Sequence, residues 1–378
     1  MSTNERPYLA TVARGLEPIA AQELESLGVK NVRPDFTVVH FLGHKILLYR
    51  VNLWARTIFR VLMPIKEIKC SNREELYKNV NKIPWKDYLE PNNTLAVNCT
   101  GGNKNLNHSH FTALEIKNAI VDQQRTKTGK RSHIDTENPD ILINAHINAG
   151  RCILSLDSSG SSLHRRGYHQ AMGLAPLKES LAAALLHMAK WEPTIPFLDP
   201  LCGSGILPLE AALKGLNIAP GLYRQRFGFE TWKDFDPTLW QKIKTDAQDS
   251  QLSELKAPIF GSDRDSNMIR QARSNAQNCS LDSQIQFSLQ ELSQIEAPTD
   301  SGIIICNPPY GKRIGSNAEL GDFYKLLSDV LKQRFKGWIA YVLMGNKELG
   351  KRIRLRTSRR IPVYNGSLPC TLLKYELY

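Results

Sequence analysis

Short apolar runs separated by amphipathic stretches organise the C-terminal half of the chain. The run GIIIC, at residues 302–306, contains three consecutive isoleucines, as expected for a strand buried on both faces. Similar runs predict strands at 195–198, 258–262, 284–289 and 338–344. Apolar residues spaced by three and four predict the intervening helices, at 177–189, around Leu209 and Leu213, from 266 or 267 through 276, at 320–335, and at 238–255 within a long insertion that covers 216–257.

The end of the chain predicts a β-hairpin. Apolar segments at 361–364 and 371–377 flank an Asn-Gly pair, Asn365 and Gly366, and this dipeptide favours a tight hairpin turn. A mostly parallel sheet that finishes in an antiparallel hairpin is what a class I methyltransferase needs, whereas a dehydrogenase usually lacks the hairpin. The fold class predicted for the C-terminal half is therefore α/β.

The N-terminal half contains two successive α+β patterns. The first predicts a strand at 8–12, a helix from Leu16 to a stop at Gly28, and a hairpin made by 37–41 and 45–48. The second predicts helices at 53–60, 73–80 and 110–127, and strands at 61–68, 94–99, 141–147 and 151–157. Residues 158–173 are rich in glycine and serine, and they predict a basic connector to the C-terminal half.

The excess of positive charge indicates a negatively charged binding partner. The chain has 378 residues, a formal net charge of +12 and a pI of about 9.3, which favours a polyanion such as RNA. Cations gather in and around the predicted helix at 110–127, although a solvated helix face is the alternative there. The candidate RNA contacts in this region and in the connector are Lys104, His110, Lys117, Arg125, Lys127, Lys130, Arg131, Arg165 and Arg166.

The apolar runs, the N-terminus and the cysteines argue against a membrane protein, a secreted protein and a zinc protein. No apolar run approaches the length needed to cross a bilayer, and the first seven residues are unlike a signal peptide, so we expect a cytoplasmic protein. The seven cysteines are scattered and form no CxxC pair, which argues against a disulfide framework and a zinc cluster. We expect no metal and no membrane partner, and a monomer or weak oligomer.

A glycine turn follows the predicted strand at 195–198 and precedes a helix. Its sequence is DPLCGSG, residues 199–205. Gly203 and Gly205 let a ligand approach the backbone, and the helix N-terminus offers free amides to an adenosine-containing ligand. Asp199 would repel a pyrophosphate but suits the ammonium group of a cationic sulfonium cofactor. A purely structural glycine turn is the alternative.

Acidic residues also end the predicted strand at 258–262. Asp263 is placed to accept hydrogen bonds from both hydroxyls of a ribose, which explains why a carboxylate is needed there. Asp265 is predicted to cap the helix that begins at Ser266 or Asn267, and capping is the structural alternative for either acid.

The isoleucine run ends abruptly in Asn307, Pro308, Pro309 and Tyr310. Ligands of open α/β sheets bind at the carboxyl ends of the strands, so this position and its chemistry agree. The alternative is a stiff turn after a buried strand, because prolines mark turns and Pro308 biases Asn307 away from helix. The glycine turn and the acid at Asp263 favour the functional interpretation.

Five segments of the chain resemble the THUMP-domain RNA guanine-N2 methyltransferases. They are LHRRGY at 163–168, APLKESLAAA at 175–184, DPLCGSGILPLEAA at 199–212, APGLYR at 219–224 and NPPYG at 307–311. The resemblance covers essentially the whole chain and is greatest to the bacterial 23S rRNA guanine-N2 enzymes in a single-methyltransferase-domain form. It implies a ferredoxin-like region at 1–52, a THUMP RNA-binding domain at 53–157, a basic linker at 158–175 and a Rossmann-like methyltransferase domain at 176–378.

The resemblance also implies a set of site residues for S-adenosyl-L-methionine and the target base. The catalytic residues would be Asn307, Pro308, Pro309 and Tyr310. The cofactor contacts would be Pro176, Leu177, Asp199, Pro200, Cys202, Gly203, Gly205, Asp263, Arg264, Gln290 and Asn307. The chain departs from the family where Ile206 replaces a usual threonine, where His169 follows RGY in place of arginine, and where Gln290 or Glu291 stands for a third cofactor acid.

The predicted reaction is methyl transfer to the exocyclic amine of a guanine in RNA. Asn307 and the carbonyl of Pro308 would accept the two amine hydrogens, and Tyr310 would stack on the base. A 23S rRNA is the expected substrate, with a tRNA as an alternative. An adenine-N6 methylase of nucleic acid remains open because NPPY is shared with that class, and so does a non-catalytic RNA-binding assembly factor.

Overall fold

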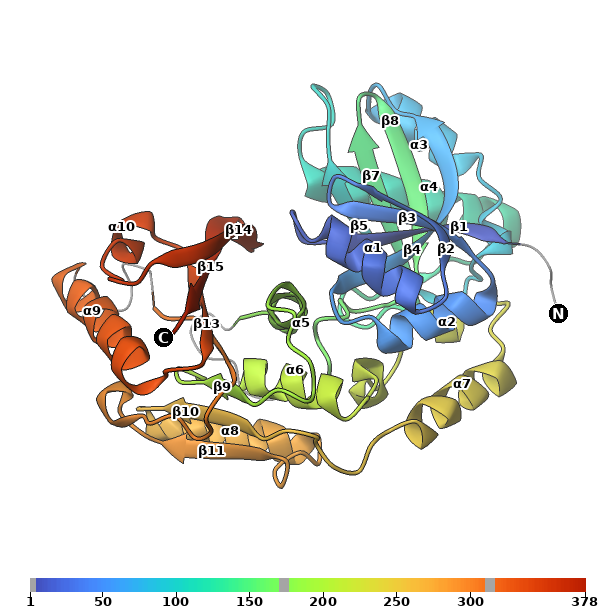
Figure 1. Cartoon of the computed structure of the whole chain (residues 1–378). Helices are drawn as coiled ribbons and strands as arrows, with labels where there is room; N and C mark the ends of the chain where they lie inside the picture. The colour runs from blue at the N-terminus through green and yellow to red at the C-terminus, as the bar shows by residue number, and fades with distance from the viewer. Residues whose placement is uncertain (1–4, 170–176, 310–316) are drawn as a thin grey trace.

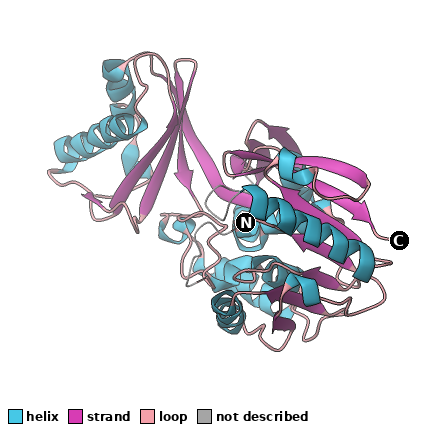
Figure 2. Cartoon of the chain, turned by 90° about the vertical axis from the view of Figure 1, so that its left-hand side faces the viewer, coloured by secondary structure: helices cyan, strands magenta, loops and turns pink. Residues whose placement is uncertain are grey.

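The computed structural model describes residues 5–169, 177–309 and 317–378, and it shows two parts, each built on its own sheet (Figure 1). Figure 2 shows the two sheets as separate groups of strands, with helices packed against each. The strand order is β2-β3-β1-β4-β8-β7-β5-β6 in the N-terminal part and β11-β10-β9-β12-β13-β15-β14 in the C-terminal part. Within the described ranges, no helix is both long and apolar enough to cross a membrane.

The N-terminal sheet is one continuous structure that joins both α+β patterns. Its longest strand, β4, pairs antiparallel with β1 from the first pattern and with β8 from the second. The strands are β1 (Arg6–Val12), β2 (Lys30–Asp35), β3 (Val38–Gly43), β4 (Ile58–Lys69), β5 (Thr94–Gly101), β6 (His133–Ile134), β7 (Ile141–Asn148) and β8 (Arg151–Asp157). The helices are α1 (Glu17–Ser26), α2 (Lys45–Trp54), α3 (Arg73–Asn81) and α4 (Ser109–Thr128), with the short 3-10 turn η1 (Trp85–Asp87).

The predicted hairpin in the first pattern is wrong. Residues 45–48 begin helix α2, and β3 pairs instead with β2 on one side and β1 on the other. A short apolar run such as ILL fits a buried helix as well as a strand, so its pattern could not decide. The predicted helix at 53–60 is also wrong, because α2 ends at Trp54 and β4 begins at Ile58. The division predicted between residues 52 and 53 falls inside α2.

Each strand predicted in the C-terminal half is present in the C-terminal sheet. Its strands are β9 (Phe197–Asp199), β10 (Ile259–Asp263), β11 (Ile285–Leu289), β12 (Ile303–Cys306), β13 (Ile339–Met344), β14 (Thr357–Asn365) and β15 (Leu368–Glu376). The first five run parallel, and β15 and β14 form the predicted antiparallel hairpin. The flanking helices are α5 (Glu179–Met188), α6 (Ile206–Gly215), α8 (Ser266–Asn278), α9 (Asn317–Arg334) and α10 (Lys347–Gly350).

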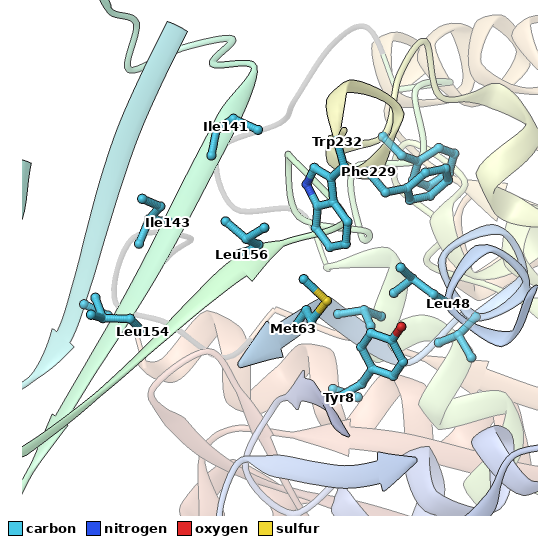
Figure 3. Close-up of a cluster of buried hydrophobic side chains, with 14 of the residues drawn as sticks. Tyr8, Leu48, Met63, Ile141, Ile143, Leu154, Leu156, Phe229 and Trp232 are labelled. Atoms are coloured by element: carbon cyan, nitrogen blue, oxygen red, sulfur yellow. The ribbon is translucent and has the colours of Figure 1, made fainter. Parts of the chain in front are cut away.

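The predicted insertion packs against the other half of the molecule. It contains α7 (Pro237–Asp249) and the 3-10 turns η2 (Pro220–Tyr223) and η3 (Gly228–Thr231). A later 3-10 turn, η4 (Leu292–Gln294), lies between β11 and β12. Phe229 stacks on Tyr49 of α2 with ring centroids 4.4 Å apart, and Trp232 belongs to the same buried cluster as Tyr8 and Met63 (Figure 3). In the reverse direction, Leu16 of the N-terminal half lies in the core of the C-terminal half. The two halves are therefore interlocked by apolar burial.

Candidate active site

The carboxyl ends of the parallel strands meet at one edge of the C-terminal sheet, and β9 stands at the point where the strand order reverses. Strand β10 lies on one side of β9 and β12 on the other. Ligands of doubly wound sheets bind at this point because the connections leave in opposite directions and open a crevice. Asp199 ends β9, Asp263 ends β10, and Asn307 directly follows β12. The sheet thus brings together the three polar residues that the sequence pattern singled out.

Asp199 is almost completely buried, with 2% of its surface exposed. Its Oδ1 accepts a hydrogen bond from the backbone nitrogen of Leu201 at 3.0 Å. Burial raises the pKa of Asp199 well above its usual value, and the nearby charge of Asp263 raises it further, against the opposing effect of the Leu201 bond. Within the described ranges no lysine or arginine pairs with either acid. An ionised Asp199 therefore gains most from a ligand that brings its own positive charge.

Backbone contacts hold the glycine turn after β9 in one shape. Cys202 donates its amide to the carbonyl of Ser262 at 2.9 Å, and Asn275 of α8 donates its side-chain amide to the carbonyl of Ser204 at 3.0 Å. Gly203 and Gly205 have φ values of +52° and +86°, which favour glycine. A Cβ at Gly205 would lie 3.0 Å from side-chain atoms of Ala272 and Phe287. The turn therefore needs glycine at 205 for both conformation and space.

Asp263 has a structural role that the sequence pattern did not reveal. Its Oδ2 accepts from the amide of Gly203 at 3.0 Å, and its Oδ1 accepts from the amide of Asp265 at 2.9 Å. Each carboxylate oxygen can accept a second bond, so ribose hydroxyls can still be bound. Asp265 caps α8, as predicted, by accepting from the amide of Asn267 at 2.8 Å. Asp263 therefore ties the end of β10 to the glycine turn.

The remaining predicted cofactor residues lie around this edge. Gln290 donates its backbone amide to the carbonyl of Asp263 at 3.0 Å, and it donates its side-chain amide to the backbone carbonyl of Gln294 at 2.9 Å. Arg264 is exposed and Leu177 is buried. Pro176 lies outside the described residues. The buried acid at 199, the glycine turn and the acid at 263 fit S-adenosyl-L-methionine, because they provide a carboxylate for its cationic part and close backbone approach for its adenosine.

Asn307, which follows β12, has a buried hydrogen-bond acceptor that lacks a donor among the described residues. Oδ1 of Asn307 is buried and has no hydrogen-bond partner among the residues that the structure describes. A buried acceptor of this kind costs about 1–3 kcal/mol when it stays unpaired, and such a cost is typical of a site completed by a ligand. Pro308 is buried and Pro309 is partly buried. Tyr310 lies outside the described residues.

A buried tyrosine on α9 contacts the backbone of Pro309, shortly after the end of β12. The hydroxyl of Tyr324 donates to the carbonyl of Pro309 at 3.0 Å, and the side chain is completely buried. The sequence pattern assigned this tyrosine only to an amphipathic helix, because nothing local links it to a carbonyl fifteen positions earlier. Tyr324 is therefore a positioning residue for the Asn307 loop.

The prediction that Arg166 contacts RNA is wrong, because its guanidinium is inside the molecule. The residue is 1% exposed. Its Nε lies 3.2 Å from Oε1 of Glu210, which also accepts from the hydroxyl of Tyr168 at 3.2 Å. Arg166 donates further bonds to the carbonyls of Ala55 and Leu163 at 3.3 and 2.8 Å. Arg166 thus links the connector to α6 and to the N-terminal half.

A histidine in the connector contacts Ser204 in the glycine turn. Nε2 of His169 lies 3.2 Å from Oγ of Ser204, and Nδ1 lies 3.5 Å from Oε1 of Glu179. Both ionisable side chains are about nine-tenths buried, with 9% and 8% exposed. The histidine that departs from the family's arginine is therefore part of the structural support of the turn.

The other predicted RNA contacts are on the surface of the N-terminal half and of the connector. Lys117 is partly exposed, and Arg165 lies exposed on the connector. Arg125 forms a long ion pair with Asp122, at 3.9 Å. The remaining exposed cations around α4 are Lys104, His110, Lys127, Lys130 and Arg131. Within the described ranges there is no group of three histidine, cysteine, aspartate or glutamate side chains placed to hold a metal ion.

Models of three families match successive parts of this chain. The RlmL ferredoxin-like domain matches residues 7–62, the THUMP domain matches residues 70–157, and the RMKL-like methyltransferase domain matches residues 166–374. The chain belongs to the RMKL-like methyltransferase family. The family resemblance and the predicted fold class are thereby confirmed, with ferredoxin-like, THUMP and class I methyltransferase domains in that order.

Two relatives of this RMKL-like methyltransferase show how far the similarity extends. A putative RNA methyltransferase of Synechocystis sp. is 58% identical over 377 residues, which is 100% of this chain and 98% of that protein. The ribosomal RNA large subunit methyltransferase K/L of Syntrophotalea carbinolica is 41% identical over 382 residues, which is 98% of this chain and 53% of that protein. The chain therefore spans about half the length of the K/L relative.

Solved structures repeat the fold over the full chain. A putative methyltransferase complexed with SAH has a TM-score of 0.89 and 27% identity, and the match covers 100% of this chain and 99% of that one. A predicted N6-adenine-specific DNA methylase from Listeria monocytogenes has a TM-score of 0.87 and 30% identity, and covers 99% of this chain and 97% of that one. The first of these contains the demethylated product of S-adenosylmethionine within the same architecture.

Proposed function

We propose that this chain transfers a methyl group from S-adenosyl-L-methionine to the exocyclic N2 of a guanine in RNA, with 23S rRNA as the substrate. The observation that carries the proposal is the orphaned Oδ1 of Asn307 at the carboxyl end of β12, beside the strand that ends in the buried Asp199. The side of the crevice at Asp199 suits a cationic group, and the side at Asn307 suits an amine that donates hydrogen bonds. The names of the Synechocystis and K/L relatives support RNA as the substrate.

The chain's own residues address the low reactivity of an exocyclic amine. The lone pair of that nitrogen is delocalised into the ring, so its two hydrogens must be drawn out of the plane. Oδ1 of Asn307 and the carbonyl of Pro308 are the acceptors proposed for those hydrogens. Both prolines restrict the backbone, and Tyr324 fixes the carbonyl of Pro309. Rigid acceptors direct the lone pair without reorganisation during the reaction.

S-adenosyl-L-methionine supplies a methyl group on a positively charged sulfur. The guanine nitrogen forms the new N–C bond as the S–C bond breaks, and the nitrogen then loses a proton to solvent. Because the methylated nitrogen is acidic, no strong base is required from the chain. Asp199 and the amides of the glycine turn hold the cofactor side, while Asn307 and Pro308 hold the amine side. The distance between the two groups of residues is set by the pairing of β9 with β12.

The N-terminal half provides the surface proposed for the RNA. Lys127, Lys130 and Arg131 are exposed at and beyond the C-terminal end of α4, where cations also complement the helix dipole. None of these three forms an ion pair with a residue that the structure describes. Unpaired exposed cations release counterions from a nucleic acid on binding. They support an RNA-binding role for the THUMP domain.

Product analysis tests the proposal directly. The chain is incubated with radiolabelled S-adenosylmethionine and with unmodified transcripts of 23S rRNA and of total tRNA, and the RNA is digested to nucleosides. We expect N2-methylguanosine from the 23S transcript. Label in the tRNA alone would identify the alternative substrate, and no label in either RNA, despite cofactor binding, would support a non-catalytic assembly factor.

Adenine N6 is the second candidate, because the Listeria relative of known structure is named as an adenine methylase. The asparagine-proline acceptors suit either exocyclic amine, so the crevice alone does not separate the bases. The same digestion decides between them, since N6-methyladenosine in RNA or in a DNA duplex would replace the proposed product.

A further inference from the structure

A single arginine lies between aromatic rings from the two halves of the molecule. Cζ of Arg14 is 4.6 Å from the ring centroid of Tyr364 in the β14–β15 hairpin, and 5.7 Å from the ring centroid of Phe36 in the β2–β3 turn. Figure 1 shows the end of β14 directed toward the N-terminal sheet. We call Phe36, Arg14 and Tyr364 the aromatic bridge.

The aromatic bridge exposes the ring of Phe36 and the guanidinium of Arg14 at the surface. Phe36 is 68% exposed, the second most exposed large apolar side chain of the described chain after Tyr378. Arg14 is also exposed, and it has no hydrogen bond or ion pair with any residue that the structure describes. The neighbouring carboxylate of Asp35 is engaged by His40 at 3.6 Å and by the amide of Phe36 at 2.7 Å. The five guanidinium donors are therefore free to bind an anion.

The backbone beneath the bridge is rigid. Leu16, two residues after Arg14, is completely buried in the core of the C-terminal half with Val363 and Cys370. The turn that carries Phe36 is held by the amide of Thr37, which donates to Oε1 of Glu17 at 2.9 Å. A backbone that is already ordered loses little further freedom on binding.

The bridge lies on the catalytic side of the C-terminal sheet. Met344, at the carboxyl end of β13, pairs with Thr371, and Tyr364 pairs with Pro369, two residues nearer the hairpin tip. Three strand spacings separate β12 from β14 in the order β12-β13-β15-β14, which is about 14 Å at the usual spacing. A nucleotide at Tyr364 would therefore be a few positions away from a base at Asn307.

The two strands that end beside the bridge carry exposed cations farther along their length. These cations are Lys30 and Arg33 on β2, and Arg359 and Arg360 on β14. Aromatic rings interleaved with arginine are the usual composition of surfaces that bind single strands, since rings stack on bases and arginine contacts phosphate.

We propose that the aromatic bridge binds single-stranded RNA flanking the target nucleotide, with Phe36 stacking on a base and Arg14 contacting a phosphate. This inference rests on the proposed function for its choice of RNA. It assigns to the junction of the two halves a contact separate from α4. Binding there would hold the strand on the side from which the target base enters the crevice.

The test compares variants for binding to a short fluorescein-labelled single-stranded RNA of mixed sequence and to its duplex. We expect Phe36→Ala to weaken single-strand binding about tenfold, by loss of one stacked base, and to leave duplex binding unchanged. Phe36→Trp should bind as wild type. Arg14→Gln should reduce the slope of log K against log salt concentration by about 0.7, the value for one phosphate on a single strand.

Tyr378→Ala is the matched control, because Tyr378 is an exposed aromatic residue, 86% accessible, just beyond the opposite end of β15. It should leave both affinities unchanged. Cofactor affinity, measured by calorimetry, should be unchanged in every variant. Wild-type single-strand affinity in both Phe36→Ala and Arg14→Gln overturns the aromatic bridge while leaving the proposed function intact. If the wild-type chain binds and methylates no RNA, the proposed function fails, and the bridge as an RNA site fails with it.

Discussion

Nε of Arg166 lies 3.2 Å from Oε1 of Glu210, and this buried pair joins the connector to the helix that starts at the glycine turn. The side chains are 1% and 0% exposed. Arg166 also donates to the carbonyl of Arg56 at 2.5 Å, and Arg56 donates to the carbonyl of Ile218 at 2.7 Å. The position of α6, and with it the cofactor side of the crevice, is therefore set by contacts with the N-terminal half.

Replacing Arg166 by methionine should lower the free energy of unfolding by about 3–5 kcal/mol, because Glu210 would remain buried without an opposite charge. Urea denaturation measures the change. The double variant Arg166→Met with Glu210→Leu should recover a large part of the loss, since neither charge is then left alone. Equal stability of the single and double variants would contradict a direct interaction between the two residues.

Asp199→Asn should stabilise the cofactor-free chain and abolish cofactor binding. Burial raises the pKa of Asp199 in the folded chain, so its contribution to stability is fully present below the ordinary pKa of 3.8 and is lost as the pH rises through the folded-state value. Asparagine keeps the acceptor for the amide of Leu201 but carries no charge. We expect a gain of about 0.5–2 kcal/mol at neutral pH.

Thermal unfolding with and without S-adenosylmethionine tests the Asp199 prediction across a pH series. The wild-type chain should lose stability with rising pH and regain it on binding the cofactor, whereas Asp199→Asn should show a flatter pH dependence and no response to the cofactor. A variant that still binds the cofactor with wild-type affinity would remove Asp199 from the site.

Asn307→Ala should reduce methyl transfer by about 10²-fold or more, because an acceptor that acts in the transition state is lost. Cofactor affinity should remain nearly unchanged. Transfer to the 23S transcript and calorimetric titration with S-adenosylmethionine measure the two effects separately. Asn148→Ala, an exposed asparagine at the end of β7, is the matched control. Survival of turnover in Asn307→Ala would falsify the proposed role of the side chain.

Tyr324→Phe should lower kcat by about 10- to 100-fold, because loss of its bond to Pro309 displaces the amine acceptors. Its effect on the free energy of unfolding should be small, about 0.5–1.5 kcal/mol, and the cofactor Kd should not change. Tyr341→Phe, a buried tyrosine of β13, controls for removal of a hydroxyl. If kcat falls equally in both variants, the loop contact is not the cause.

Long elements and turn chemistry could be predicted from local sequence. The periodicity of α4 and the isoleucine run of β12 are each contained in the element's own sequence. The Asn-Gly pair likewise identified the β14–β15 hairpin. Strand β2 was missed because its residues are nearly all exposed and include Pro34, a composition tolerated only at a sheet edge. The short run that opens α2 was misassigned because its length did not distinguish helix from strand.

The sequence by itself determined the order of the elements in the C-terminal half and the residues at the ends of β9, β10 and β12, because strand termini and their polar residues are encoded locally. Only the tertiary structure decided which side chains those residues meet. Arg166 appears in sequence as one of many exposed cations, yet it is buried against a glutamate 44 positions away. Arg14 appears isolated, yet the fold places it between rings of two separate sheets. Burial and long-range pairing depend on packing of distant segments, which no local pattern records.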